Sequence, residues 1–181
     1  FTVHFARPGV MLDLGAIGKG YAVEQAMGLL REAGVTRALI HGGTSTAGAM
    51  GAPPDAAGWQ VVIDRPTPDG RAKSETRLAT VTLKDEAMSV SAVWGKCFAA
   101  GGEIFGHEID PRTGWPTRAA VLAAVVSTSA TESDALSTAL ITSGLDGHAA
   151  IARLRPGLRT LVVAPGADGL RIAAHGLAWE A

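Results

Sequence analysis

The chain has 181 residues, with 16 Lys and Arg against 17 Asp and Glu, for a formal charge of −1, and 47% of its residues are hydrophobic. This composition excludes an intrinsically disordered chain and argues against nucleic acid as a partner, because a near-neutral sequence without a basic run has no positive field for a phosphate backbone. Its longest apolar runs, such as residues 121–126, are much shorter than the roughly 20 residues that span a bilayer, so no transmembrane segment is predicted.

The first part of the chain is predicted to contain strands and one helix. Residues 2–5 and 10–14 have the pattern of strands and lead into a glycine-rich turn at 15–20. Apolar residues at helical spacing predict a helix over 21–33, which ends at Gly34. Further strands are predicted at 37–41, 59–64 and 78–83, the last two as a hairpin with a long tip at 65–70.

The second part begins with short strands predicted at 87–93 and 103–109, followed by a turn at 110–116 in which two prolines exclude regular structure. A buried strand is predicted at 121–127 from its β-branched residues. Thr131 and Asp134 have the spacing of a capping box and predict the start of a helix over 135–143. The remaining predicted elements are a short helix at 148–154 and strands at 158–164 and 170–175. With no repeat or linker, the sequence predicts one α+β domain over residues 1–181.

A first candidate site is the turn from Asp13 to Gly20, where a strand ends in glycines and Lys19 lies at a helix start. Free amide groups beside a positive side chain are typical of phosphate binding. The turn is not a Walker A loop, because Asp13 stands where that motif needs glycine and Gly20 where it needs Ser or Thr. The alternative is an ordinary strand-to-helix turn with a solvated lysine.

Asp134, Ser137 and Thr138 form a second candidate site, because positions i, i+3 and i+4 project from one face of a helix. A carboxylate and two hydroxyls are hard oxygen ligands of the kind that Mg²⁺ or Ca²⁺ prefers. In the alternative interpretation, Asp134 only favours the helix dipole and Thr138 bonds back to the backbone.

His107 precedes the rigid turn at 110–116 and is a candidate base, because an imidazole titrates near neutral pH. The alternative is a surface or core histidine, with Arg112 and Asp110 forming a simple pair that stabilises the turn.

Four blocks occur in an order that resembles the ApbE family of FAD:protein FMN transferases: Asp-Leu-Gly-x-Ile-x-Lys-Gly-Tyr-Ala from Asp13, a Gly-Gly turn, His-x-Ile-Asp-Pro-Arg-Thr-Gly-x-Pro from His107, and Asp-Ala-Leu-Ser-Thr-Ala from Asp134. The resemblance runs from about Val10 to the end of the chain. It implies an ApbE-like α+β fold with mixed or antiparallel sheets and packed helices.

The resemblance also implies a function: Mg²⁺-dependent transfer of FMN from FAD to a threonine of an acceptor flavoprotein, with release of AMP. Carried over by motif, Asp13, Lys19 and the backbone of Ile109 would contact FAD, and His107 would be the base that deprotonates the acceptor hydroxyl. The carbonyl of Ala16 and the side chains of Asp134 and Thr138 would hold the metal, with Ser137 as a further ligand in some relatives. Family habit places such enzymes in the bacterial cell envelope or periplasm, with the membrane involved only through an acceptor or an N-terminal anchor.

Three departures from the family pattern are expected to matter. Gly42-Gly43-Thr44-Ser45 lacks a carboxylate that many relatives carry after the second glycine, and Ser89-Val90-Ser91-Ala92 is followed by the bulkier Trp94-Gly95-Lys96. The family's N-terminal portion, which contributes flavin contacts, is not recognisable ahead of Val10. Two alternatives therefore stay open: an FAD pyrophosphatase that uses water at the same site, and a flavin-binding module without catalysis.

Overall fold

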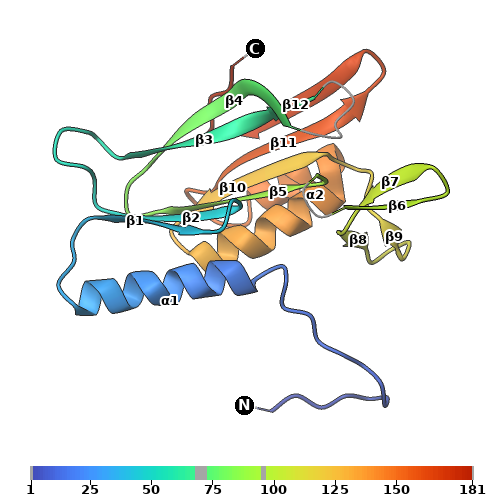
Figure 1. The fold of residues 1–181 in the computed structure, drawn as a ribbon, viewed down its shortest axis with the longest axis horizontal. Coiled ribbons are helices and arrows are strands. Elements are labelled where there is room, and N and C mark those ends of the chain that lie inside the picture. Colours follow the sequence, from blue (N-terminus) through green and yellow to red (C-terminus); the bar gives the residue numbers. More distant parts are fainter. Residues whose placement is uncertain (1, 68–72, 95–96, 181) are drawn as a thin grey trace.

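The computed structural model (Figure 1) describes residues 2–67, 73–94 and 97–180 and is built around one six-stranded antiparallel sheet. The strand order is β1-β2-β5-β10-β11-β12. The strands are β1 (Ala38–Gly42), β2 (Thr46–Met50), β5 (Ala87–Ala92), β10 (Leu122–Ser127), β11 (Arg159–Gly166) and β12 (Gly169–His175). Two helices, α1 (Gly18–Glu32) and α2 (Ala130–Ala152), lie on one side of the sheet, and the hairpin of β3 (Trp59–Pro66) and β4 (Lys73–Leu83) lies on the other (Figure 1). The predicted α+β fold with antiparallel sheets and packed helices is confirmed.

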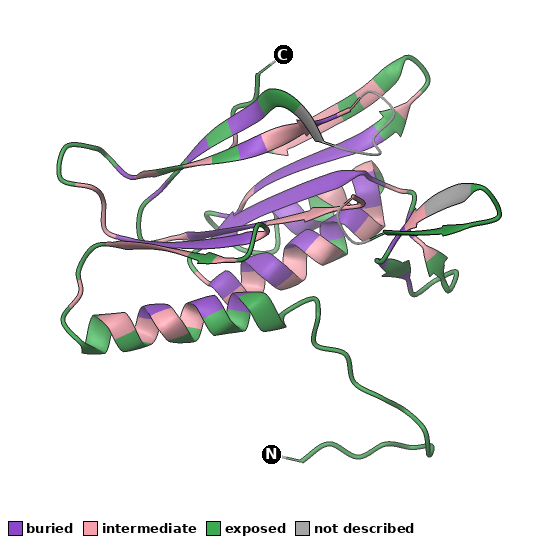
Figure 2. Cartoon of the chain, viewed as in Figure 1, coloured by how far each residue is buried: buried purple, intermediate pink, exposed green. Residues whose placement is uncertain are grey.

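The central strand β10 explains how the three layers are held together. All six of its residues are buried, and its side chains alternate between two apolar cores. Leu122, Ala124 and Val126 pack toward the β3–β4 hairpin, whereas Ala123 and Val125 pack toward α2. A strand that is covered on both faces has a nearly continuous apolar sequence, which is why the prediction for 121–127 was correct. Figure 2 shows this buried layer between the two outer ones.

Helix α2 begins earlier than predicted, and Thr131 is not its N-cap. Ser129 is the cap, and its side chain accepts a hydrogen bond from the amide of Glu132, so the Ser-x-x-Glu pattern lies two residues before the predicted one. The two helices predicted at 135–143 and 148–154 form one element with a kink at Gly144, whose φ is +62°. A Cβ at Gly144 would lie 2.6 Å from the carbonyl oxygen of Ala119, so this position needs glycine for space as well as for conformation.

Helix α1 is tied to the start of α2 by Glu24. Its Oε2 accepts hydrogen bonds from the hydroxyl of Ser129 (2.7 Å) and the amide of Thr131 (2.9 Å). Burial acts to raise the pKa of Glu24, but these bonds and the charge of Arg31 hold it below its usual value. The carboxylate thus satisfies an amide at the start of α2 and fixes the two helices side by side.

Two small hairpins extend from the end of the main sheet (Figure 1): β6 (Cys97–Ala100) with β7 (Glu103–Gly106), and β8 (Ile109–Asp110) with β9 (Trp115–Pro116). The strand predicted at 103–109 is therefore interrupted by a bend at His107. The prediction that prolines exclude regular structure over 110–116 was wrong at both ends of the segment. Asp110 pairs with Trp115, and Pro116 pairs with Ile109 at the end of a two-residue strand that does not need its missing amide. Residues 68–70 of the predicted tip lie outside the described residues. Gly95 and Lys96 lie outside them as well.

The strands predicted at 2–5 and 10–14 are wrong. Residues 2–14 are exposed, form no strand and extend away from the packed layers (Figure 2). The apolar pattern is present, but a strand also needs a neighbour for its backbone groups, and no described strand pairs with this segment. None of the described helices has the length and apolarity needed to cross a membrane.

Candidate functional site

The start of α1 and the second turn of α2 meet at Asp134. The amide of Gly20 donates a hydrogen bond to Asp134 Oδ2 (2.9 Å), and Lys19 Nζ lies 3.5 Å from Asp134 Oδ1. The same ammonium group lies 3.3 Å from the carbonyl oxygen of Gly15, in the glycine-rich turn. The side chain of Asp134 is only 4% exposed. Its burial is balanced by two sources of positive potential, the N-terminus of α1 and the lysine.

Gly20 is what allows the two helices to approach so closely. A Cβ at this position would lie 2.7 Å from the Cβ of Asp134 and would overlap the carbonyl oxygen of Ala130. Every other residue type would therefore push α1 away from α2 and lengthen the hydrogen bond to Asp134.

The glycine-rich turn takes its shape from internal hydrogen bonds. Asp13 is exposed, and its Oδ1 accepts a hydrogen bond from the amide of Gly15 (2.6 Å), whereas the carbonyl of Leu14 accepts from Ile17 (3.0 Å) and Gly18 (2.7 Å). Because the amide of Gly20 is held by Asp134, the helix start does bind an anion, but that anion is the protein's own carboxylate. The prediction of free amides at this turn is corrected, because the amides of Gly15, Ile17, Gly18 and Gly20 all donate hydrogen bonds within the protein.

Behind Asp134, hydroxyl groups connect α2 to β5. The hydroxyl of Ser137, which is fully buried, donates to the carbonyl of Asp134 (3.0 Å) and lies 2.9 Å from Ser91 Oγ. Thr138 Oγ1 lies 3.3 Å from the same Ser91 oxygen and 3.4 Å from the Asp134 carbonyl. The back-bonding that the sequence left open for Thr138 is therefore present, and Ser137 bonds back to the same carbonyl.

Sequence reasoning missed Ser91 as part of this site. The signal was available in the strand pattern: Ser89 and Ser91 alternate along β5, so their side chains point to the same face of the sheet. Ser89 Oγ lies 3.1 Å from both Thr46 Oγ1 and Ser133 Oγ. One row of hydroxyls therefore runs between the sheet and the buried face of α2.

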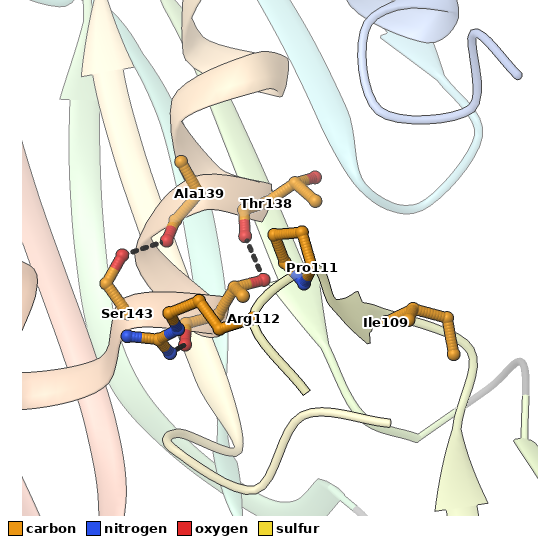
Figure 3. Close-up of a pocket in the computed structure, with 7 residues that line it drawn as sticks. Ile109, Pro111, Arg112, Thr138, Ala139 and Ser143 are labelled. Carbon is orange, nitrogen blue, oxygen red and sulfur yellow. Dashed lines mark hydrogen bonds between the residues drawn. The ribbon is translucent and has the colours of Figure 1, made fainter. Parts of the chain in front are cut away.

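Thr138 also lines a pocket of about 420 Å³ beside the turn of β8 and β9 (Figure 3). Its lining residues are Ile109, Pro111, Arg112, Thr138, Ala139, Thr142 and Ser143. Ile109 is half exposed at the rim, so the structure brings it to the same hollow as Thr138.

Arg112 fixes the wall of this pocket. Its guanidinium binds both carboxylate oxygens of Asp110, at 2.9 and 2.7 Å, and donates to the carbonyl of Thr142 in α2 (3.0 Å). The hydrogen bonds from Arg112 hold the pKa of Asp110 below its usual value. The turn-stabilising pair expected from the sequence is present, and it also ties the turn to α2.

His107 lies at the bend between β7 and β8, with half of its side chain exposed. Its Nε2 lies 3.4 Å from Oε1 of the buried Glu108. Lys19 is one of the charges that act on Glu108, so the two parts of the site are linked electrostatically.

The oxygen atoms around Asp134 suit a hard cation whose remaining ligands are water and substrate phosphates. Among the described residues, no three His, Cys, Asp or Glu side chains form a metal-binding cluster. One carboxylate with carbonyl and hydroxyl oxygens is nonetheless the usual protein share of a Mg²⁺ site, where water and substrate phosphates supply the rest. A positive group already lies between the glycine turn and Asp134, because the ammonium of Lys19 contacts both. Ala16 is exposed in that turn, next to Gly15.

Gly42, just before the turn of residues 43–45 at which the family resemblance led us to expect a carboxylate, lies beside α1. A Cβ on Gly42 would come within 2.8 Å of Val23 Cγ2 and 3.6 Å of the Lys19 carbonyl. Thr44 is exposed in this turn.

Comparison with known proteins gives one consistent family. The ApbE family model matches residues 2–162. The FAD:protein FMN transferase of Rhodobacter capsulatus is 37% identical over 146 residues, which cover 79% of this chain and 26% of that protein. The enzyme of the same name from Haemophilus influenzae is 33% identical over 147 residues, with 80% and 41% covered. The chain thus spans between about a quarter and two fifths of the length of these two curated relatives.

Solved structures show the same fold. The apo form of the flavinyl transferase ApbE from Pseudomonas stutzeri matches with a TM-score of 0.72 and 27% identity, covering 90% of this chain and 49% of that one. The ApbE protein from Thermotoga maritima matches with a TM-score of 0.74 and 25% identity, covering 96% and 52%.

Proposed function

The chain belongs to the ApbE family, and on that premise we propose that it carries out Mg²⁺-dependent transfer of FMN from FAD to a threonine hydroxyl of an acceptor protein, with release of AMP. The observation that carries the proposal is the meeting of the glycine turn and Asp134 around one positive group. A site of this kind suits the diphosphate of a dinucleotide, because it can bring positive charge to the bridge that has to be cleaved.

In the proposed reaction, the acceptor oxygen forms a bond to the phosphorus of the FMN half. The bond between that phosphorus and the bridging oxygen breaks, and AMP leaves with the bridging oxygen and its electron pair. The hydroxyl proton goes to His107. Bound Mg²⁺ would neutralise the charge on the diphosphate oxygens, with Asp134, the Ala16 carbonyl, Thr138 and Ser137 as its protein ligands.

The remaining residues would bind and orient FAD. Lys19 is 44% exposed, so its ammonium can turn from Asp134 toward a phosphate when a divalent cation takes its place. Ile109, which is half exposed and lines the pocket, would contact FAD through its backbone. Asp13 would contact FAD, and the hydrogen bond that it accepts from the amide of Gly15 would hold the shape of the turn.

Replacing His107 with alanine is expected to lower kcat of transfer about 100-fold or more, because a positioned general base typically contributes 10²- to 10⁴-fold. The dissociation constant of FAD should change by less than about threefold, since the half-exposed imidazole is not among the residues that line the pocket. Single-turnover transfer and fluorescence titration with FAD measure the two quantities. Equal loss of both would make His107 a binding or structural residue.

Two other functions are separated by the same assay. The protein is incubated with FAD, Mg²⁺ and a threonine-containing acceptor peptide, and the products are analysed by mass spectrometry. A gain of one FMN on the peptide supports transfer, whereas AMP and free FMN without a gain indicate hydrolysis by water. Binding of FAD without products indicates a flavin-binding module. The acceptor flavoprotein and the location in the cell envelope stay predictions from the family resemblance.

A further inference from the structure

Glu108 is a buried acidic residue to which the sequence motif assigns no role. Its side chain is 7% exposed, and its Oε1 lies 3.4 Å from Nε2 of His107. The other oxygen, Oε2, is fully buried and has no hydrogen-bond partner among the described residues. Adjacent residues in a strand point to opposite faces. Here the bend at His107 interrupts the strand and lets the two neighbouring side chains meet.

The surroundings of Glu108 do not favour a charge. A Cβ on Gly106 would lie 3.2 Å from Oε2 and 3.3 Å from both the Cβ and the carbonyl oxygen of Val93, so the carboxyl is packed closely against the backbone at Gly106. Burial raises the pKa of Glu108, and the charges of His107 and Lys19 act against that shift. Among the described residues, these are the two charged side chains that act on the pKa of Glu108. An apolar side chain would suit the fold better at this position, which points to a role in the chemistry of the site.

We propose that Glu108 is a positioning residue for His107: its carboxylate faces Nε2 of the imidazole and stabilises the imidazolium that forms when His107 accepts the proton of the acceptor hydroxyl. The inference rests on the proposed function, since it concerns the same proton. The carboxylate does not itself take the proton, because its part is to hold the ring and to oppose the positive charge that develops on it.

The test compares Glu108→Gln, which keeps the shape and removes the charge, with Glu108→Asp, which keeps the charge. Glu108→Gln should lower kcat of transfer about 10- to 100-fold, because the loss of the charge removes part of the contribution of the general base. It should leave KM for FAD within about twofold. Glu108→Asp should recover part of the loss. Glu86→Gln is the control, because Glu86 pairs with Arg159 at the opposite end of β5 from Val93; its kcat should be unchanged.

Thermal unfolding separates this role from a structural one. Because the folded protein raises the pKa of Glu108, the carboxylate destabilises the fold above that pKa and has no such effect below the usual value of 4.5. Glu108→Gln should therefore unfold at a higher temperature than the wild type at pH 8 and at about the same temperature at pH 4. A variant that is more stable and less active supports the inference. A variant with unchanged kcat, or one whose lost activity follows lost stability, overturns it.

A readout that does not need turnover keeps the two proposals apart. Wild-type protein that binds FAD but forms no product would contradict the proposed function. The ¹⁵N shifts of the His107 ring then still test the contact: in the neutral ring the proton should lie on Nε2 in the wild type, and Glu108→Leu should shift it toward Nδ1. Identical ring shifts in the two proteins would show that Glu108 does not hold His107.

Discussion

Replacing Asp134 with asparagine is expected to reduce Mg²⁺-dependent turnover at least about 100-fold. A hard cation would lose its one charged ligand, and the several kcal/mol that a metal supplies to the transition state correspond to at least two decades in rate. The amide oxygen of asparagine can still accept the hydrogen bond from Gly20, so the contact between α1 and α2 should persist. Initial rates over a range of Mg²⁺ concentrations measure the effect.

The control for this prediction is Asp146→Asn, the same chemical change at an exposed position of the same helix. It should leave the rate and its Mg²⁺ dependence unaltered. If Asp134→Asn retained full activity at low Mg²⁺, Asp134 would not be a metal ligand.

The second large effect is expected for Gly20→Ala. The added methyl group would overlap the backbone carbonyl of Ala130 and press on the Cβ of Asp134. A backbone atom cannot move aside as a flexible side chain can, so we expect a loss in the free energy of unfolding of about 3 kcal/mol, the upper part of the usual range for overpacking. Transfer activity should fall as well, because the displaced α1 of the variant would move Lys19 and the glycine turn away from Asp134.

Gly28→Ala provides a matched control within the same helix. No heavy atom lies within 4 Å of a Cβ at Gly28, so the substitution should stabilise the protein by about 0.5–1 kcal/mol through helix propensity alone. Chemical denaturation of both variants measures the contrast. Equal stability of the two would contradict the close packing of α1 on α2.

The sequence was informative where a pattern is local. The apolar run of β10 and the helical spacing of α1 predicted those elements, because burial on two faces or on one stripe leaves a direct mark on the residues. Residues 2–14 show the limit of this reasoning, since their pattern is that of strands but no described strand pairs with them.

The start of α2 shows a different limit. Two cap patterns overlap in this sequence, one at Thr131 and one at Ser129. The structure selects Ser129, where a contact from Glu24, more than 100 positions earlier, reinforces the cap. Sequence spacing alone contains no information on such a partner.

For the candidate site, motif order predicted which residues belong together but not how they meet. The contact of Gly20 with Asp134 depends on the crossing of two helices 114 positions apart. Glu108 escaped notice because it occupies a position that the motif leaves unspecified, and the interest of this residue follows only from its burial and from the nearby imidazole.

The central claim is that a divalent ion lies between the glycine turn and Asp134. Crystals grown with FAD and Mn²⁺ in place of Mg²⁺ test it through the anomalous scattering of manganese. The account predicts one peak per chain in contact with the Asp134 carboxylate and the Ala16 carbonyl, with Lys19 turned away from Asp134. FAD bound with no such peak, and Lys19 still paired with Asp134, would contradict it.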